Sequence, residues 1–156
     1  MKKKPKICFI SSAGGHLEQL RQLDKVRERY DYYWVLPRNK STKKIVGKKY
    51  LINDFPRNMG KIVFFSGLFW TAIQQLIVFV IQRPDFVITT GAGVAYPTCM
   101  FAHICGKKLI YIESFARMKS LNVTGQKLYP YADLFVVQWK ELLKLVPKAV
   151  YGGWIY

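Results

Sequence analysis

Two glycines and a histidine stand where a short apolar run gives way to the pattern of an amphipathic helix. They are Gly14, Gly15 and His16 in the stretch ICFISSAGGHLEQL, residues 7–20. A helix that begins at glycines presents its first backbone N–H groups and the positive end of its dipole to the space above the strand. Such a turn suits an anion, most often a phosphate. The alternative is that the glycines only form the turn and that His16 is an ordinary residue of the first helical turn.

A second glycine loop, GAGVAYP at residues 91–97, follows another apolar run and opens another helix. The loop is two-thirds of the GxGxxG motif, and Glu113 follows Gly91 by 22 residues, where a ribose-binding acid is expected. This pattern favours a free-standing nucleotide or dinucleotide enzyme. Against that interpretation, Tyr96 replaces the third glycine, and the unit comes late in the chain, behind another glycine loop.

Two phosphate-binding loops beside a carboxylate instead suit a diphosphate-linked sugar. Backbone N–H groups would hold the phosphates, and Glu113 would hold sugar hydroxyls. His16 can hydrogen-bond a phosphate or act as a base, because the unperturbed pKa of histidine is about 6.5. Arg117 can pair with a phosphate. The alternative for Glu113 and Arg117 is a local surface ion pair, worth about 0 to 1 kcal/mol.

Apolar runs alternate with helical patterns along the whole chain. Strands are expected at residues 7–10, 32–36, 50–52, 86–89, 108–112 and 134–137. Helices are expected from residue 15, with Leu17, Leu20, Leu23 and Val26 on one face, and at 62–81, 96 onward, 124–131 and 140–146. The basic residues 37–49 are expected to form a loop. The alternation predicts an α/β fold with a Rossmann-like, doubly wound parallel sheet, whose ligands bind at the carboxyl ends of the strands.

Residues 62–81, IVFFSGLFWTAIQQLIVFVI, carry no charge, and about 20 such residues are long enough to cross a membrane as a helix. A crossing would separate two halves of one sheet, so the alternatives are a buried helix or one that lies in the membrane interface. Over about residues 60–82, a weakly polar stripe of Gly67, Thr71, Gln74 and Gln82 suits the sheet. The bulky residues are expected to enter lipid: Phe65, Phe69, Trp70, Leu76 and Phe79.

The 156 residues, 51% of them hydrophobic, fit one domain, 1–156, whose core needs no disulfide or metal. Three cysteines, Cys8, Cys99 and Cys105, lack CxxC spacing and are expected to be small buried thiols. Two histidines without ligand spacing predict no metal site, and no cofactor is expected. The amino terminus is not expected to carry a secretory signal.

The net charge of +16 is unevenly distributed: residues 1–61 hold 16 Lys and Arg against five acidic residues, and residues 62–156 hold nine against four. A nucleic acid or an anionic membrane surface would each explain this excess. We find no basic motif interleaved with aromatic residues of the RNA-binding type, so a membrane is expected rather than a nucleic acid.

Five segments, taken in order, resemble the Alg14-like family. They are SSAGGH at 11–16, PDFVITTGAGVAYP at 84–97, IYIESFAR at 110–117, TGQKLYPYADLFVVQW at 124–139 and the ending YGGWIY. This family comprises the membrane-associated subunits of the two-part UDP-N-acetylglucosamine transferase of dolichol-linked oligosaccharide assembly. The chain looks more similar still to the bacterial capsule and exopolysaccharide counterparts, which enhance a partner galactosyl- or glucosyltransferase. A fainter similarity extends to the acceptor domain of the glycosyltransferase MurG.

The resemblance implies the N-terminal acceptor half of a GT-B glycosyltransferase, which presents a polyprenyl-diphosphate-linked sugar to a partner. It implies contact with the acceptor diphosphate for Ser12, Gly14, Gly15, His16, Gly91, Gly93 and Arg117. Glu113 would orient the acceptor sugar, and His16 and Glu113 are the candidate catalytic residues. The first loop departs from MurG at Ser-Ser-Ala, where MurG carries more glycine.

The same resemblance implies a partner subunit that binds the UDP sugar and transfers it, so that this chain is expected to be inactive alone. The tail at about 150–156 ends in the apolar residues Trp154, Ile155 and Tyr156, which are expected to bind that partner. The expected location is the cytoplasmic face of a membrane, as a peripheral or monotopic protein.

Overall fold

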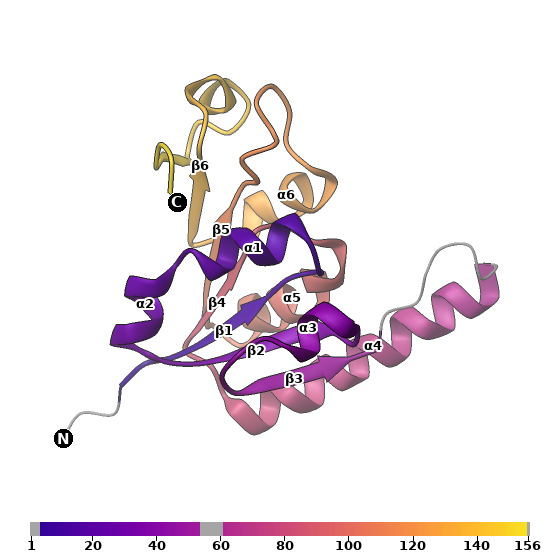
Figure 1. The fold of residues 1–156 in the computed structure, drawn as a ribbon. Coiled ribbons are helices and arrows are strands. Elements are labelled where there is room, and N and C mark those ends of the chain that lie inside the picture. Colours follow the sequence, from indigo (N-terminus) through magenta and orange to yellow (C-terminus); the bar gives the residue numbers. More distant parts are fainter. Residues whose placement is uncertain (1–3, 54–60, 156) are drawn as a thin grey trace.

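The computed structural model describes residues 4–53 and 61–155. Within them, seven strands form one parallel sheet in the order β3-β2-β1-β4-β5-β6-β7 (Figure 1). The strands are β1 (Lys6–Ile10), β2 (Asp31–Pro37), β3 (Lys49–Ile52), β4 (Phe86–Thr89), β5 (Lys108–Ile112), β6 (Leu134–Val137) and β7 (Val150–Tyr151). The predicted α/β fold and parallel sheet are confirmed, and the predicted strands 86–89, 108–112 and 134–137 coincide with β4, β5 and β6.

Helices cover both faces of the sheet. The α-helices are α1 (Gly15–Arg21), α2 (Asp24–Arg29), α3 (Lys40–Lys43), α4 (Lys61–Gln82), α5 (Tyr96–Ile104) and α6 (Val123–Leu128). Short 3₁₀ helices are η2 (Gly93–Ala95), η3 (Tyr129–Tyr131) and η4 (Lys140–Lys144). Residues of α1 and α2 pack on one face of the sheet, and residues of α4, α5 and α6 pack on the other.

Alternate residues of each central strand enter two separate apolar clusters. In β1, Cys8 and Ile10 belong to the cluster under α4 and α5, whereas Ile7 and Phe9 belong to the cluster under α1. Successive side chains of a strand point to opposite faces, and both faces are covered, so the strands are apolar along their whole length. This explains why they appear in the sequence as short continuous apolar runs.

The single helix predicted after residue 15 is wrong in one respect, because the structure divides it. Leu23, at φ −80° and ψ 46°, interrupts the helical backbone between α1 and α2. The predicted apolar face is nevertheless confirmed, since Leu17 and Leu20 are buried and Leu23 and Val26 pack against the same cluster.

The basic residues 37–49, predicted to form a loop, contain the short helix α3. Asn39 and Thr42 cap it reciprocally: the Asn39 side chain accepts from the Thr42 N–H at 2.9 Å, and the Asn39 N–H donates to the Thr42 hydroxyl at 3.1 Å. The Thr42 hydroxyl also donates to the carbonyl of Pro37 at 2.5 Å. These contacts hold the helix against the end of β2.

Three smaller expectations are also corrected. The strand β7 was not predicted, because two residues are too short to show an alternating pattern. The helix predicted at 140–146 is the 3₁₀ helix η4. Cys8 and Cys99 are buried as expected, whereas Cys105 is exposed beyond the end of α5.

The helix α4 lies along the sheet at its β3 side and also contacts α5; its first half projects past the end of β3 (Figure 1). The predicted polar stripe is confirmed, because Thr71 and Gln82 are buried and Gln74 is half-buried. The prediction that Phe79 faces lipid is wrong. Its side chain is only 5% exposed and its ring centroid lies 6.1 Å from that of Phe101 on α5.

Candidate functional site

The strand order reverses between β1 and β4, so their carboxyl ends form the switch point at which open α/β sheets bind ligands. The first glycine loop follows β1, and the second follows β4. One side-chain contact joins the two glycine loops, and another joins α1 to the loop after β5. The Thr90 hydroxyl donates to the carbonyl of His16 at 2.9 Å, and the Gln19 amide donates to the hydroxyl of Ser114 at 3.2 Å. The loops after β1, β4 and β5 therefore form one connected edge.

The first glycine loop is open to solvent. Gly14 has φ 85° and ψ −145°, a backbone conformation that only glycine adopts readily, and it precedes α1 without any side-chain cap. Gly14 and Gly15 are both exposed, with no atoms near the position of an added Cβ. Ser12 is half-buried between this loop and β1. The backbone at Gly14 and Gly15 is therefore free to approach a ligand closely, as predicted for diphosphate contact.

His16 is half-buried in the first turn of α1. Its Nδ1 atom is buried and accepts or donates no hydrogen bond within the described chain. Burial lowers the pKa of His16 below its ordinary value, and the positive charge of Arg117 lowers it further, against a raising contribution from the contact with Thr90. The imidazole is therefore neutral at pH 7 and able to accept a proton.

Glu113 lies at the carboxyl end of β5 and is fully buried, at 0% exposure. Its carboxyl group accepts hydrogen bonds from the Ser114 N–H at 2.8 Å, the Asn122 side-chain amide at 2.7 Å and the Asn122 N–H at 3.2 Å. Burial raises the pKa of Glu113 to about 7, although these donors and the Arg117 charge act in the opposite direction. The structure thus shows a carboxyl group that holds the loop after β5, and its role toward a sugar stays a prediction.

Arg117 is exposed and lies close enough to influence both His16 and Glu113 electrostatically. The local ion pair considered for Arg117 and Glu113 is absent from the part of the chain that the structure describes, since Glu113 bonds to uncharged donors. The structure therefore brings together three of the predicted side chains, His16, Glu113 and Arg117, and leaves the cation available to an anion.

The second glycine loop is more closely packed than the first. Gly91 is buried at φ 97°, its N–H donates to the Thr89 hydroxyl at 3.2 Å, and an added Cβ would overlap Tyr111 and Asn122. Gly91 is thus a packing position, and its predicted contact with the acceptor diphosphate stays a prediction. Gly93 is exposed in open space at the start of η2, and its predicted contact with diphosphate stays a prediction.

Asn122 is a central residue of this edge that was not predicted. Its side-chain amide nitrogen donates to Glu113, and its side-chain oxygen Oδ1 accepts from the Gly125 N–H at 2.7 Å, which caps α6. Its place before a helical pattern is the helix-capping signal by which it could have been found. Asn122 connects the loop after β5 to α6 and packs against Gly91 of the second glycine loop.

A second feature not predicted is a stack of aromatic rings beside this edge. Phe115 lies between Trp139 and Trp154, with ring centroids 4.9 Å and 5.3 Å away. Trp154 is 74% exposed, whereas Ile155 is half-buried and packs against the apolar cluster under α1. Tyr156 lies outside the described residues. The Gln138 side chain links the tail to the site, because it accepts from the Ile155 N–H at 3.5 Å and donates to the carbonyl of Glu113 at 3.0 Å.

The dinucleotide alternative loses support from these contacts. A ribose-binding acid needs a free carboxylate, but both oxygens of Glu113 already accept protein hydrogen bonds. No three His, Cys, Asp or Glu side chains gather as a metal site in residues 4–53 and 61–155.

We expect the stability of the fold to decrease as the pH rises toward 7, because of Glu113. Its folded pKa of about 7 lies above the ordinary value of 4.5, so the folded chain binds this proton more tightly than the unfolded chain does between those values. The free energy of unfolding, relative to that of a Glu113→Gln variant, should fall by about 3 kcal/mol across this window and then level off. Urea unfolding of both proteins at several pH values measures it, and a constant difference would contradict the raised pKa.

The fold is that of one half of a GT-B enzyme. MurG from Acinetobacter baumannii matches with a TM-score of 0.73 over 88% of this chain and 42% of that one, at 15% identity. UDP-N-acetylglucosamine 2-epimerase from Rickettsia bellii matches with a TM-score of 0.72 over 92% and 41%, at 11% identity. Such low identities establish a shared fold and nothing more.

Residues 7–155 match the family described as "Oligosaccharide biosynthesis protein Alg14 like", and the chain belongs to this family. The UDP-N-acetylglucosamine transferase subunit ALG14 of Debaryomyces hansenii is 29% identical in an alignment 174 positions long, which covers 94% of this chain and 74% of that protein. The human subunit of the same name is 39% identical over 77 residues, which cover 46% of this chain and 36% of that protein. The resemblance noted in the sequence is therefore confirmed.

Proposed function

We propose that this chain holds a polyprenyl-diphosphate-linked sugar at a membrane and presents it to a separate catalytic subunit. The partner would bind most of the UDP sugar donor and transfer the sugar, in lipid-linked oligosaccharide or in capsular and exopolysaccharide synthesis. The chain would then act as the acceptor half of a two-part glycosyltransferase, with little or no activity alone.

The observation that carries this proposal is the composition of the edge between β1 and β4. An exposed glycine backbone at Gly14 and Gly15 lies beside His16, and the Arg117 cation lies near enough to change the pKa of His16. Diphosphate binding requires backbone N–H groups that can approach an anion, and a cation nearby. Removing a proton from a sugar hydroxyl requires a neutral base. His16 is the candidate base, with Glu113 second because its carboxyl group is buried.

The names of the relatives support a partner. Those from Debaryomyces hansenii and human are called subunits of UDP-N-acetylglucosamine transferase. The tail offers a surface for such a partner, since the Trp154 ring is exposed and stacks on Phe115, close to Glu113. We therefore keep Trp154 as the main partner-binding candidate, with Ile155 contributing from a half-buried position and Tyr156 adjacent in sequence.

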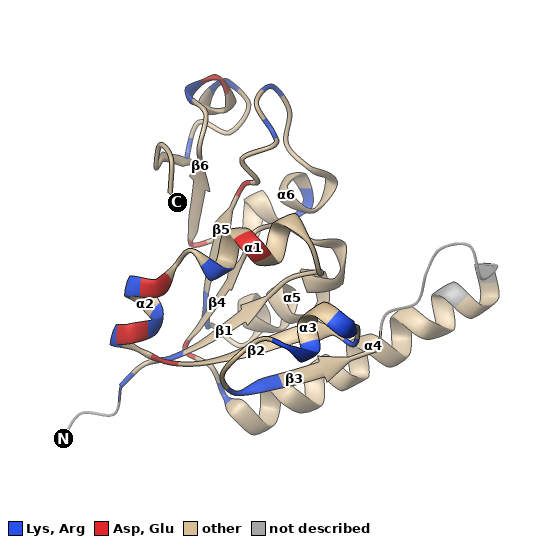
Figure 2. Ribbon diagram, in the orientation of Figure 1, with Lys and Arg blue, Asp and Glu red and all other residues tan. Residues whose placement is uncertain are grey.

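The membrane surface in this proposal is the outer face of α4. Ten apolar side chains of this helix are exposed: Ile62, Val63, Phe65, Leu68, Phe69, Trp70, Leu76, Ile77, Val80 and Ile81. Figure 2 shows that the described part of α4 is free of charge, whereas basic residues lie on α3 and β3, and α2 carries residues of both signs. A contiguous apolar face of this size on a domain surface is typical of a membrane or protein contact, and basic residues nearby favour anionic lipid.

The inner face of α4 favours a monotopic arrangement over a membrane span, although the segment Phe65–Gln82 is long and apolar enough to cross a bilayer. Gln75 accepts from the Thr98 N–H at 3.1 Å and donates to the carbonyl of Val94 at 3.0 Å. Gln74 accepts from the Asn53 N–H at 2.9 Å. A span would pull these amides away from their partners into hydrocarbon, which costs several kcal/mol for each unsatisfied group. We therefore propose that α4 lies in the interface, on the cytoplasmic face.

We expect a Phe65→Glu, Phe69→Glu variant to lose membrane binding by about 100-fold or more. Both side chains are well exposed, at 65% and 71%, and each phenyl ring that leaves lipid forfeits about 2 kcal/mol. The matched control is Val123→Glu, Leu145→Glu, which adds the same charge at exposed apolar sites away from α4. Co-sedimentation with vesicles that contain phosphatidylglycerol measures binding, and equal losses in the two variants would contradict the assignment to α4.

The function is tested by sugar transfer from a panel of UDP sugars to a lipid-diphosphate-linked sugar in membranes. This chain, a candidate partner and the two together are compared. Strong transfer by the pair and little by either alone is the expected result. Full activity of this chain alone would overturn the accessory role, and saturable binding of NAD or a UDP sugar to the lone chain would favour a free-standing nucleotide enzyme instead.

A further inference from the structure

A groove runs between α1 and α3, beside the first glycine loop. We call it the α1–α3 groove. Its volume is about 490 Å³, and its lining includes Gly14, Leu17 and Arg21 from the α1 side and Lys40, Ser41 and Lys44 from the α3 side. Small-molecule sites typically occupy about 300 to 1,000 Å³, so this space is large enough for a phosphate-bearing ligand.

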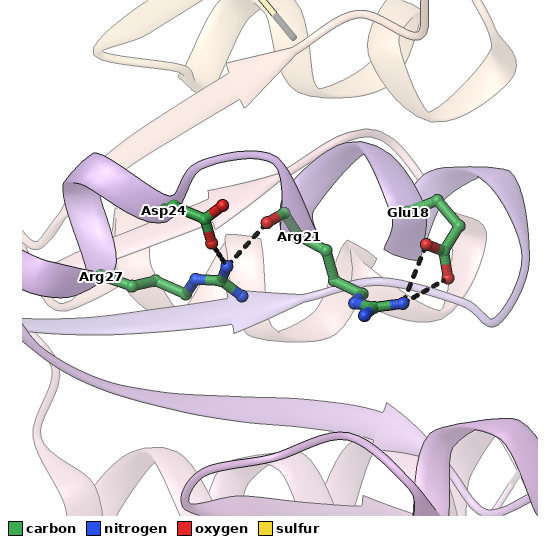
Figure 3. A network of polar contacts seen from close by, with 4 residues as sticks. All are labelled: Glu18, Arg21, Asp24 and Arg27. Atoms are coloured by element: carbon green, nitrogen blue, oxygen red, sulfur yellow. Dashed lines mark hydrogen bonds and ion pairs between the residues drawn. The ribbon is translucent and has the colours of Figure 1, made fainter.

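Glu18, the acidic residue in the lining of this groove, is already paired within α1, and the neighbouring Asp24 is paired within α2. Arg21 donates to both carboxylate oxygens of Glu18, at 2.9 Å and 3.1 Å, and Arg27 pairs with Asp24 and with the carbonyl of Arg21 (Figure 3). These pairs neutralise the carboxylates on the α1 side. On the opposite side, Lys40 and Lys44 have no acidic partner anywhere in the described ranges. The groove therefore carries uncompensated positive charge on its α3 side.

The two lysines are presented by a helix that is firmly held. Asn39 and Thr42 cap the start of α3, and the Lys49 ammonium caps its end by donating to the carbonyls of Lys43 and Ile45, both at 2.6 Å. Lys40 and Lys44 are four residues apart, which places them on one face of the helical turn. Like charges at this spacing repel each other, and an anion bound between them relieves the repulsion.

The position of the groove indicates where its ligand comes from. It opens beside Gly14, at the carboxyl edge of the sheet. The first half of α4, which carries the exposed Phe65 and Phe69, projects past the same edge (Figure 1). A lipid whose chain lies in the membrane under α4 can therefore bring a charged head to the groove.

We propose that the α1–α3 groove binds the diphosphate of a polyprenyl lipid, with Lys40 and Lys44 each holding one phosphate. This inference rests on the proposed function and adds two binding residues to it. Lysine ammonium groups bind phosphate as point charges, and both Lys40 and Lys44 line the groove. The diphosphate would then lie between α3 and the first glycine loop.

The test uses the full chain and phosphatidylcholine vesicles that carry a small fraction of undecaprenyl diphosphate. Plain phosphatidylcholine vesicles give the binding due to α4 alone, and phosphatidylglycerol vesicles of equal charge give general attraction to anionic lipid. The variant Lys40→Ala, Lys44→Ala is compared with Lys25→Ala, Lys43→Ala, which removes the same charge from exposed positions outside the groove.

We expect the groove variant to lose about tenfold or more in affinity for undecaprenyl diphosphate vesicles, and the control variant to keep it. The two variants should bind phosphatidylglycerol vesicles equally. Equal losses on undecaprenyl diphosphate, or no loss in either variant, would overturn the inference. Displacement of the lipid by UDP would also overturn it, because the groove would then take a soluble diphosphate.

Sugar transfer with the partner separates this inference from the proposed function. If the unaltered pair transfers sugar and the groove variant transfers it equally well, the groove assignment fails while the function stands. A second outcome is that the pair shows no transfer while the groove variant, but not the control variant, loses binding of undecaprenyl diphosphate. In that case the function fails and the groove assignment stands.

Discussion

Replacing His16 with alanine is expected to lower sugar transfer by the partnered chain by about 100-fold or more. A positioned general base contributes about 10² to 10⁴ in rate. His16 suits this role because its pKa is lowered by burial and by Arg117, so the imidazole is unprotonated at pH 7. The substitution is expected to spare the fold, because the Thr90 hydroxyl bonds to the backbone carbonyl of His16, which alanine keeps, and the buried Nδ1 has no hydrogen-bond partner among the described residues. What the variant loses is the contact between the imidazole and the Thr90 backbone.

The matched control is His103→Ala, which changes the other histidine, an exposed residue of α5 that packs on Tyr131. This variant should transfer sugar at the rate of the unaltered pair. The pH profile adds a second readout: transfer by the unaltered pair should decrease on the acidic side as His16 becomes protonated, and this limb should be missing from the His16→Ala variant. Unchanged transfer by a folded, partner-bound His16→Ala variant would remove His16 from the site.

Replacing Gly91 with alanine is expected to destabilise the fold by about 3 kcal/mol or more, and to lower the melting temperature by about 10 °C. Two independent causes act together. Gly91 has φ 97°, which strains any other residue, and an added Cβ would overlap the Tyr111 hydroxyl and the Asn122 amide. Tyr111 cannot move aside easily, because its ring stacks on Phe135 at a centroid distance of 4.5 Å within the core.

Gly93→Ala is the matched control, because Gly93 lies two residues further along the same loop in open space and without a positive φ. We expect its stability to change by less than about 0.5 kcal/mol. Thermal unfolding followed by circular dichroism, in the same detergent for all three proteins, measures both changes. Equal stabilities for the two variants would show that the packing around Gly91 is looser than the structure describes.

The sheet could be predicted from the sequence because its strands are short, apolar on both faces and separated by helical patterns. The strands 86–89, 108–112 and 134–137 have these properties and coincide with β4, β5 and β6. The polar stripe of α4 could also be predicted, because its residues recur at the spacing of an α-helix. The apolar side chain of Phe79 was placed on the wrong face because its burial depends on α5, which only the tertiary packing brings beside it.

The candidate site was predictable in its location but less so in its contacts. The glycine loops and Glu113 end successive strands, so their meeting at one edge follows from a parallel sheet. The contacts among them do not follow, because they depend on residues far apart in sequence. Gly91 looks like part of a phosphate loop, yet it is needed to make room for Tyr111 and Asn122. In the sequence Glu113 resembles a free acid, yet its carboxyl group accepts hydrogen bonds from the Asn122 side chain and the Ser114 N–H.

The place of β1 in the middle of the sheet has a consequence for how the chain folds. β1 pairs with β2 nearby in sequence, but its other neighbour is β4, where Ile7 lies opposite Phe86. β1 therefore pairs with β4 only after the whole of α4, which lies between them in the sequence, is available. A topology with such distant strand pairs has a high contact order and folds slowly. During that interval the inner side of α4, which includes Phe79, is uncovered as well as its outer apolar face. Lipid present at that stage would shield it, and refolding from denaturant without lipid or detergent should lead to aggregation.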